Sequence, residues 1–168
     1  MAHARDNFLA WVRNAHAMEE QAITMLTAQV RRIENYPELK ERFEQHLRET
    51  QAHAQELADL LERMSGGKST LKDLAARLAA TAQGFGGIFT NDEIIKAAIA
   101  SYAFDHVQIG TYRVLIAAAD EVDEFEAKAI FERMLAEETA MAQWLEANLD
   151  AITRVFLMRD ERDLQAKR

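Results

Sequence analysis

Apolar side chains recur every three or four positions along most of the chain, which is the spacing of amphipathic helices. Segments with this period lie at about 4–34, 37–64, 92–119 and 123–149. In the first segment the apolar stripe contains Phe8, Val12, Ala15, Ala22, Leu26 and Ile33. With one proline and six glycines in 168 residues, few positions interrupt these segments. The pattern predicts four long helices and an all-α fold.

The connections between these predicted helices differ in length. Pro37 follows a short break and suits the first turn of the second helix, and only a few residues separate the third helix from the fourth. Short connections make antiparallel hairpins. The long connection, 65–91, has room for a short helix at 70–82, and a short tail helix is expected at 150–159. Two hairpins joined by one long crossover form the ferritin-like four-helix bundle, so we expect one domain over 1–168.

Composition and charge exclude several classes of function. The chain has 28 acidic and 20 basic residues, a net charge of −8, and no long basic run, so nucleic acid is not an expected partner. No apolar window reaches the length of a membrane span. The chain has no cysteine, which removes disulfides and thiolate chemistry and fits a reducing cytoplasm. We therefore expect a cytoplasmic protein without membrane or nucleic-acid contacts.

Several carboxylates fall on the inward faces of the predicted helices. There is one such acid on each helix: Glu19, Glu49, Asp105 and Glu138. His46 and His53 lie on the same side of the second helix as Glu49. Burying several unpaired carboxylates together costs several kcal/mol, and no lysine or arginine occupies a central stripe position. A divalent cation with oxygen and imidazole ligands would resolve this conflict.

The two predicted hairpins repeat one pattern of candidate ligands. The first helix of each offers a single acid, and the second offers an acid with a follower four positions later. His53 follows Glu49 in this way, whereas Ala142 follows Glu138. Di-iron carboxylate bundles use acids from two helices and acid–histidine pairs from the other two. The pattern therefore indicates such a site with one position lacking, and a polar seam of water and protonated acids is the alternative.

Other constellations give little support to a hydrolytic enzyme. Leu47 follows His46, so there is no HExxH motif, and neither a cysteine nor a GxSxG elbow supplies a nucleophile. Tyr102 and Tyr112 lie near Asp105 on the third helix. They are either hydrogen-bond donors to the candidate site or packed core residues.

Four stretches carry a family resemblance: "AHAMEEQAI", "PELKERFEQHLRETQAHAQEL", "AFDHVQIGTYRVL" and "MLAEETAMAQWLEANL". Through them the chain resembles the YciE/YciF-type ferritin-like bacterial proteins over roughly 5–155. These proteins are compared with rubrerythrin and are associated with stress responses, and their biochemical role is not established. The resemblance implies a ferritin-like bundle, commonly a homodimer, with a candidate di-iron site.

Carried over by position, the resemblance implies metal ligands at Glu19, Glu49 and Glu138. His46 matches the histidine that opens the "HLxET" motif, where it either binds the metal or braces a ligand. The third-helix pattern of the family, E-H-x-E, is Asp105-His106-Val107-Gln108 here. One metal position is then formed by Glu19, Glu49, His53 and Glu138, and a second is left with Asp105, Gln108 and His106.

These observations lead to one principal hypothesis and two rivals. The principal one is a ferritin-like protein that holds one or two non-haem iron ions, with Glu49 and Glu138 bridging them and with O2 or peroxide at an open coordination position. Manganese or zinc is also compatible with such ligands. The first rival is a metal-free structural or interaction protein that forms a helical-bundle dimer. The second is a carrier of a hydrophobic ligand.

Overall fold

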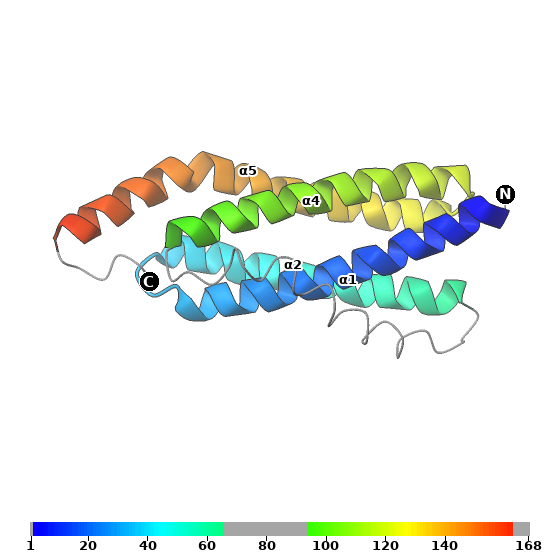
Figure 1. The fold of residues 1–168 in the computed structure, drawn as a ribbon, viewed down its shortest axis with the longest axis horizontal. Coiled ribbons are helices and arrows are strands. Elements are labelled where there is room, and N and C mark those ends of the chain that lie inside the picture. The colour runs from blue at the N-terminus through cyan, green and yellow to red at the C-terminus, as the bar shows by residue number, and fades with distance from the viewer. Residues whose placement is uncertain (1, 66–93, 163–168) are drawn as a thin grey trace.

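The described part of the chain, residues 2–65 and 94–162 of a computed structural model, folds into four long helices (Figure 1). They are α1 (Ala2–Arg32), α2 (Pro37–Met64), α4 (Ile94–Glu121) and α5 (Phe125–Glu161). The α1–α2 hairpin lies beside the α4–α5 hairpin, with α1 packed against α4 and α2 facing α5. The predicted all-α, ferritin-like class is confirmed.

Local chemistry explains where the helices begin and end. Pro37 opens α2, where its missing N–H would have had no partner in the helix. At the end of α4, Asp123 adopts a left-handed backbone with φ of 60°, and the Glu124 N–H donates to the carbonyl of Ala119 at 2.9 Å. This is the Schellman ending of a helix, with aspartate in the position that glycine usually takes. The short α4–α5 connection follows from it.

The fourth helix extends beyond its predicted end. The tail expected as a separate short helix at 150–159 is helical, and it continues α5 to Glu161 without a break. Neither glycine nor proline occurs in α5, and Ile152 continues its buried face. The predicted crossover helix at 70–82 lies outside the described residues. None of the described helices combines the length and the apolarity that a bilayer crossing requires.

The core of the bundle has an apolar cluster towards each end. The cluster that contains the start of α1 includes Phe8, Val12, Leu57, Leu61, Leu115, Phe131 and Met134. The cluster that contains the end of α1 includes Leu26, Ile33, Leu39, Phe43, Met141 and Leu145. Buried polar side chains lie between these clusters along every helix: Glu19, His46, Thr50, His53, Asp105, Gln108 and Glu138. The fold therefore holds a polar layer at mid-height between two apolar clusters.

Candidate metal centre

Two groups of three buried side chains meet in the polar layer. One group is Glu19, His53 and Glu138, and the other is His46, Asp105 and Glu138. In each group one potential ligand atom per residue lies within 4.8 Å of the others. The groups share Glu138 of α5, and together they draw side chains from all four helices.

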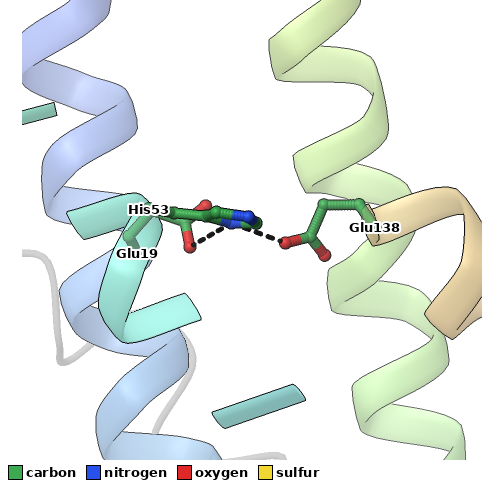
Figure 2. A group of neighbouring side chains, drawn as sticks. All are labelled: Glu19, His53 and Glu138. Carbon is green, nitrogen blue, oxygen red and sulfur yellow. Dashed lines mark ion pairs between the residues drawn. The ribbon is translucent and has the colours of Figure 1, made fainter. Parts of the chain in front are cut away.

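In the first group the ring of His53 lies between two carboxylates. Its Nδ1 is 3.6 Å from Glu19 Oε2 and 3.3 Å from Glu138 Oε1. Figure 2 shows Glu19 from α1 and Glu138 from α5 pointing toward the same edge of the imidazole ring. All three side chains are fully buried. An oxygen–nitrogen–oxygen set of this kind is typical of ligands for a divalent transition metal.

In the second group His46 takes the place that His53 has in the first. Its Nε2 is 3.6 Å from Asp105 Oδ1 and 3.4 Å from Glu138 Oε2. Glu138 thus presents Oε1 to His53 and Oε2 to His46. A carboxylate that offers one oxygen to each group is in the position that a bridge between two ions would need.

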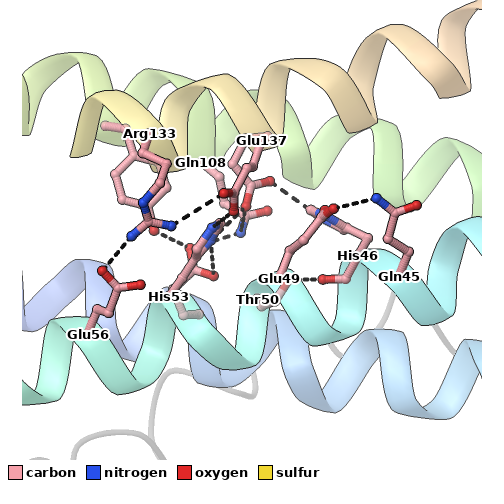
Figure 3. A network of polar contacts seen from close by, with 12 residues as sticks. Gln45, His46, Glu49, Thr50, His53, Glu56, Gln108, Arg133 and Glu137 are labelled. Atoms are coloured by element: carbon pink, nitrogen blue, oxygen red, sulfur yellow. Dashed lines mark hydrogen bonds and ion pairs between the residues drawn. The ribbon is translucent and has the colours of Figure 1, made fainter. Parts of the chain in front are cut away.

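The outer nitrogen of each histidine faces a second, half-buried carboxylate. His53 Nε2 is 2.6 Å from Glu137 Oε2, and His46 Nδ1 is 3.1 Å from Glu49 Oε2 (Figure 3). Histidines that bind metals usually donate their other N–H to a carboxylate, which fixes the tautomer and the ring orientation. Both histidines therefore direct their inner nitrogen at the buried acids.

This arrangement changes the role expected for Glu49. The sequence placed Glu49 among the ligands, but the structure brings it into neither three-residue group. It lies behind His46, where it also accepts a hydrogen bond from Gln45 at 2.8 Å. Glu137, which has the corresponding place behind His53, was missed because it lies beside the apolar stripe of its helix. The only sequence signal for it is the paired acid in "AEE".

Gln108 and Tyr112 hold the carboxylate of Glu19 from the α4 side. Tyr112 Oη donates to Glu19 Oε1 at 2.6 Å, and Gln108 Nε2 donates to the same oxygen at 2.9 Å. Gln108 Nε2 also lies 3.2 Å from Glu138 Oε1. Gln108 therefore contributes to the site as a hydrogen-bond donor to Glu19 and Glu138. Tyr112 is both a donor to Glu19 and a buried core residue. Glu19 Oε2 is left facing His53.

His106 lies outside both groups. It is exposed, its Nδ1 lies 2.9 Å from the carbonyl oxygen of Tyr102, and its ring packs on the Tyr102 ring with centroids 4.5 Å apart. A helix turns about 100° per residue, so the position after the inward-facing Asp105 points away from the core. The structure therefore does not bring His106 to the candidate centre.

Six buried atoms of the polar layer have no hydrogen-bond partner among the described residues. They are Glu19 Oε2, His46 Nε2, His53 Nδ1, Asp105 Oδ2, Gln108 Oε1 and Glu138 Oε2. Buried polar atoms are nearly always paired, because leaving one unpaired costs about 1–3 kcal/mol. Five of these atoms belong to the two three-residue groups, so a cation placed among them would satisfy atoms that the protein alone does not.

The electrostatics of the layer depend on the two histidines. Burial alone lowers the pKa of His46, but Asp105, Glu49 and Glu138 together raise it to about 10. Burial likewise lowers the pKa of His53, and Glu138 and Glu19 raise it to about 10. Burial raises the pKa of Glu138 to about 7. Without a metal, positive imidazolium rings therefore offset the buried acids.

The family of the chain follows from its sequence matches. Residues 3–158 match the family described as a domain of unknown function, DUF892, and the chain belongs to that family. The YciF-type resemblance noted from the motifs is confirmed.

Solved structures show the same fold. A protein from Xanthomonas campestris pv. campestris is 37% identical, with a TM-score of 0.78 over 94% of this chain and 99% of its own. The Escherichia coli stress protein YciF is 20% identical, with a TM-score of 0.70 over 89% of this chain and 96% of its own. YcfI from Rhodopseudomonas palustris is 21% identical, with a TM-score of 0.64 over 85% and 92% of the two chains.

Proposed function

We propose that this protein is a ferritin-like, non-haem iron-binding protein whose centre holds two ions that share Glu138. Glu19 and His53 would complete one position, and His46 and Asp105 the other. The observation that carries this proposal is the convergence in one buried layer of inner atoms from both histidines and three acids, which have no hydrogen-bond partner among the described residues. Iron bound there would supply redox chemistry toward O2 or peroxide; manganese or zinc also fits oxygen and imidazole ligands.

The surrounding residues support such a centre in three ways. Tyr112 and Gln108 hold one oxygen of Glu19 and leave the other directed inward. Glu137 and Glu49 hold the outer nitrogens of the two histidines. The apolar clusters pack the core on both sides of the polar layer. Because the fold is that of the E. coli stress protein YciF, we extend the proposal to a stress-associated role in the cytoplasm.

The test is metal content, measured by mass spectrometry after expression with added iron. We expect about two ions per chain, as in di-iron bundles, and nearly none in Glu138→Gln. Glu146→Gln is the matched control, because Glu146 is an exposed glutamate on the same helix. Thermal unfolding with Fe(II) is the second measurement, since an ion that binds only the folded state must raise the midpoint. Less than about a tenth of an ion per chain, with no shift by Fe(II), would overturn the proposal.

One observation favours a metal-free structural protein as the second candidate. The raised pKa values of His46 and His53 let both rings carry positive charge at neutral pH, which offsets the buried acids without an ion. In that case Glu138→Gln would change neither metal content nor the response to Fe(II). It would change the stability of the protein in the presence of a chelator.

The outer surface of α4 supports a homodimer as part of the proposal. Part of the exposed side of this helix is apolar, as well as its buried side, which is unusual for a helix at a surface. An exposed stripe, the α4 outer stripe, consists of Ile99, Ala103, Val107, Gly110, Val114 and Ala117. A Cβ atom at Gly110 would meet nothing within 4 Å, so packing inside the chain gives no reason for glycine there.

Two copies of the α4 outer stripe match in size when they pack antiparallel. If the twofold axis crosses the stripe between Val107 and Gly110, each larger side chain faces a smaller one. The pairs are Ile99 with Ala117, Ala103 with Val114, and Val107 with Gly110. Self-complementary contacts of this kind define a twofold dimer interface. We expect Val107→Glu to yield monomers by light scattering, whereas Leu157→Glu, at an exposed site on α5, leaves the mass unchanged. A monomeric wild type would contradict the interface.

A further inference from the structure

The surface between α2 and α5 differs from the other helix interfaces. These two helices contact each other over far fewer residues than α1 with α2, α4 with α5, or α1 with α4. Figure 3 looks onto this surface, which we name the α2–α5 seam and define by Glu49, Glu56, Arg133 and Glu137. Behind it lie His46 and His53. The seam therefore covers the candidate centre where the helices contact each other least.

The carboxylates of the seam join the centre to the solvent. The side chain of Glu49 is 21% exposed and that of Glu137 is 30% exposed, yet each contacts the outer nitrogen of a buried histidine. Glu56 adds a third acid, 34% exposed. These oxygens are ligands that hard and borderline divalent cations accept. They lead from the surface to the two buried histidines, and at the His46 end Arg42 Nη1 lies 3.5 Å from Glu49 Oε2.

The α1–α4 interface is built from hydrogen bonds between buried groups. Between α1 and α4, Gln29 Nε2 donates to the carbonyl of Ala97 at 3.2 Å, and Ser101 Oγ donates to Gln29 Oε1 at 2.9 Å. Tyr112 is fully buried and closes the region behind Glu19. Gln29 and Ser101 are buried and hydrogen-bonded across the α1–α4 interface, which stabilises the contact between these helices.

Arg133 spans the seam on the His53 side, between Glu56 of α2 and Glu137 of α5. Its guanidinium pairs with Glu56 of α2, and its Nη1 donates to Glu137 Oε1 at 3.3 Å on its own helix. Glu137 in turn contacts His53, so the arginine occupies the two outer acids that lie nearest this half of the centre (Figure 3). Arg133 pairs with no member of either three-residue group among the described residues. Arg133 therefore lies between the solvent and the candidate centre and is not placed to bind the ion.

From this geometry we propose that the α2–α5 seam is the path by which a divalent cation reaches the centre, and that Arg133 closes it. The incoming ion displaces the guanidinium from Glu56 and Glu137 and then passes to the inner atoms. This inference rests on the proposed metal binding. Because Arg133 pairs with no proposed ligand among the described residues, we expect it to slow uptake and release alike, with little change in the equilibrium affinity.

The test is the rate of Co(II) uptake by metal-free protein, followed by stopped-flow absorbance, and of release to an excess of chelator. Arg133→Gln should accelerate both rates by about threefold or more, the order of effect that exposed ion pairs carry, with the Kd unchanged within about twofold. Arg133→Lys, which keeps the charge and loses the planar fork, should lie between this variant and the wild type. Arg154→Gln is the matched control, since Arg154 is an exposed arginine of α5 that pairs with Asp150 at 2.9 Å.

The possible results separate this inference from the proposed function. If the wild type takes up no Co(II) and its stability does not respond to Fe(II), metal binding itself fails, and the path with it. If the wild type binds Co(II) and Arg133→Gln matches its rates, the path is wrong and the metal centre stands. A change in Kd through the release rate alone would make Arg133 a structural support of the centre, which also overturns the path.

Discussion

The candidate centre has two halves that share Glu138 and are supported to different degrees. In the half formed by Glu19 and His53, Tyr112 and Gln108 both donate to Glu19, so one carboxylate oxygen is held and the other directed inward. In the half formed by His46 and Asp105, Asp105 Oδ2 has no hydrogen-bond partner among the described residues. We name these the Glu19 half and the Asp105 half. Ligands that are already held bind at a smaller entropic cost, so the Glu19 half should bind its ion more tightly.

The most direct way to break this comparison is to remove one histidine at a time. We expect His53→Ala to weaken the tighter of two binding steps and His46→Ala to weaken only the other. Each loss of affinity should be about 100-fold or more, because losing a ligand costs more than the 10–100-fold that follows from losing its hydrogen-bond support. Titration calorimetry with Co(II) or Fe(II) under anaerobic conditions resolves the two steps. Equal losses from the two variants would mean that the halves bind as one unit.

The second prediction sharpens the comparison through Tyr112. Replacing it with phenylalanine removes the hydroxyl that holds Glu19 Oε1 and should weaken the tighter step by about 10–100-fold, with the weaker step unchanged. Tyr102→Phe is the control, because Tyr102 packs on His106 away from both groups. Circular dichroism should show both variants folded. If the Asp105 half weakens equally, Tyr112 supports the whole polar layer and not one half.

The third prediction concerns the metal-free protein and its response to pH. The pKa values of His46 and His53 are raised from 6.5 to about 10, so the folded state holds protons that the unfolded chain has lost. Their stabilisation is complete below pH 6.5 and is lost as pH rises toward 10. The raised pKa of Glu138, about 7 against 4.5, acts with the same sign at lower pH. The free energy of unfolding should fall by up to about 1.4 kcal/mol per pH unit for each histidine.

Urea unfolding with a chelator at pH 6, 7, 8 and 9 measures this slope. His46→Gln and His53→Gln should each reduce it by about half, because each removes one of the two titrating rings. Unequal reductions would show which half carries more of the charge. A flat profile in the wild type would mean that the folded state holds no more protons than the unfolded chain, so that both rings are neutral and the acids are ionised. Bound metal should reverse the trend, because its ligands must lose their protons.

Most of the fold could be predicted from the sequence because its helices are long and regular. The stripe of Phe8, Val12 and Leu26 and the break before Pro37 need no tertiary information, since side-chain direction along a helix follows from its pitch. The same rule predicted that Glu19, Asp105 and Glu138 face the core. It also separates His106 from Asp105, although the family pattern had grouped them as ligands.

The sequence by itself determined which helices form and which of their faces carry buried acids and histidines. Only the tertiary structure decided that Glu49 lies behind His46, that Glu137 has the same place behind His53, and which nitrogen of each ring faces inward. Helical pitch specifies the direction of each Cβ atom, but not the rotation of one helix against the next or the rotamer of a long side chain. The helix rotations and side-chain rotamers depend on how the apolar clusters pack at the two ends. Contacts among four helices cannot be predicted from the periodicity of any one helix.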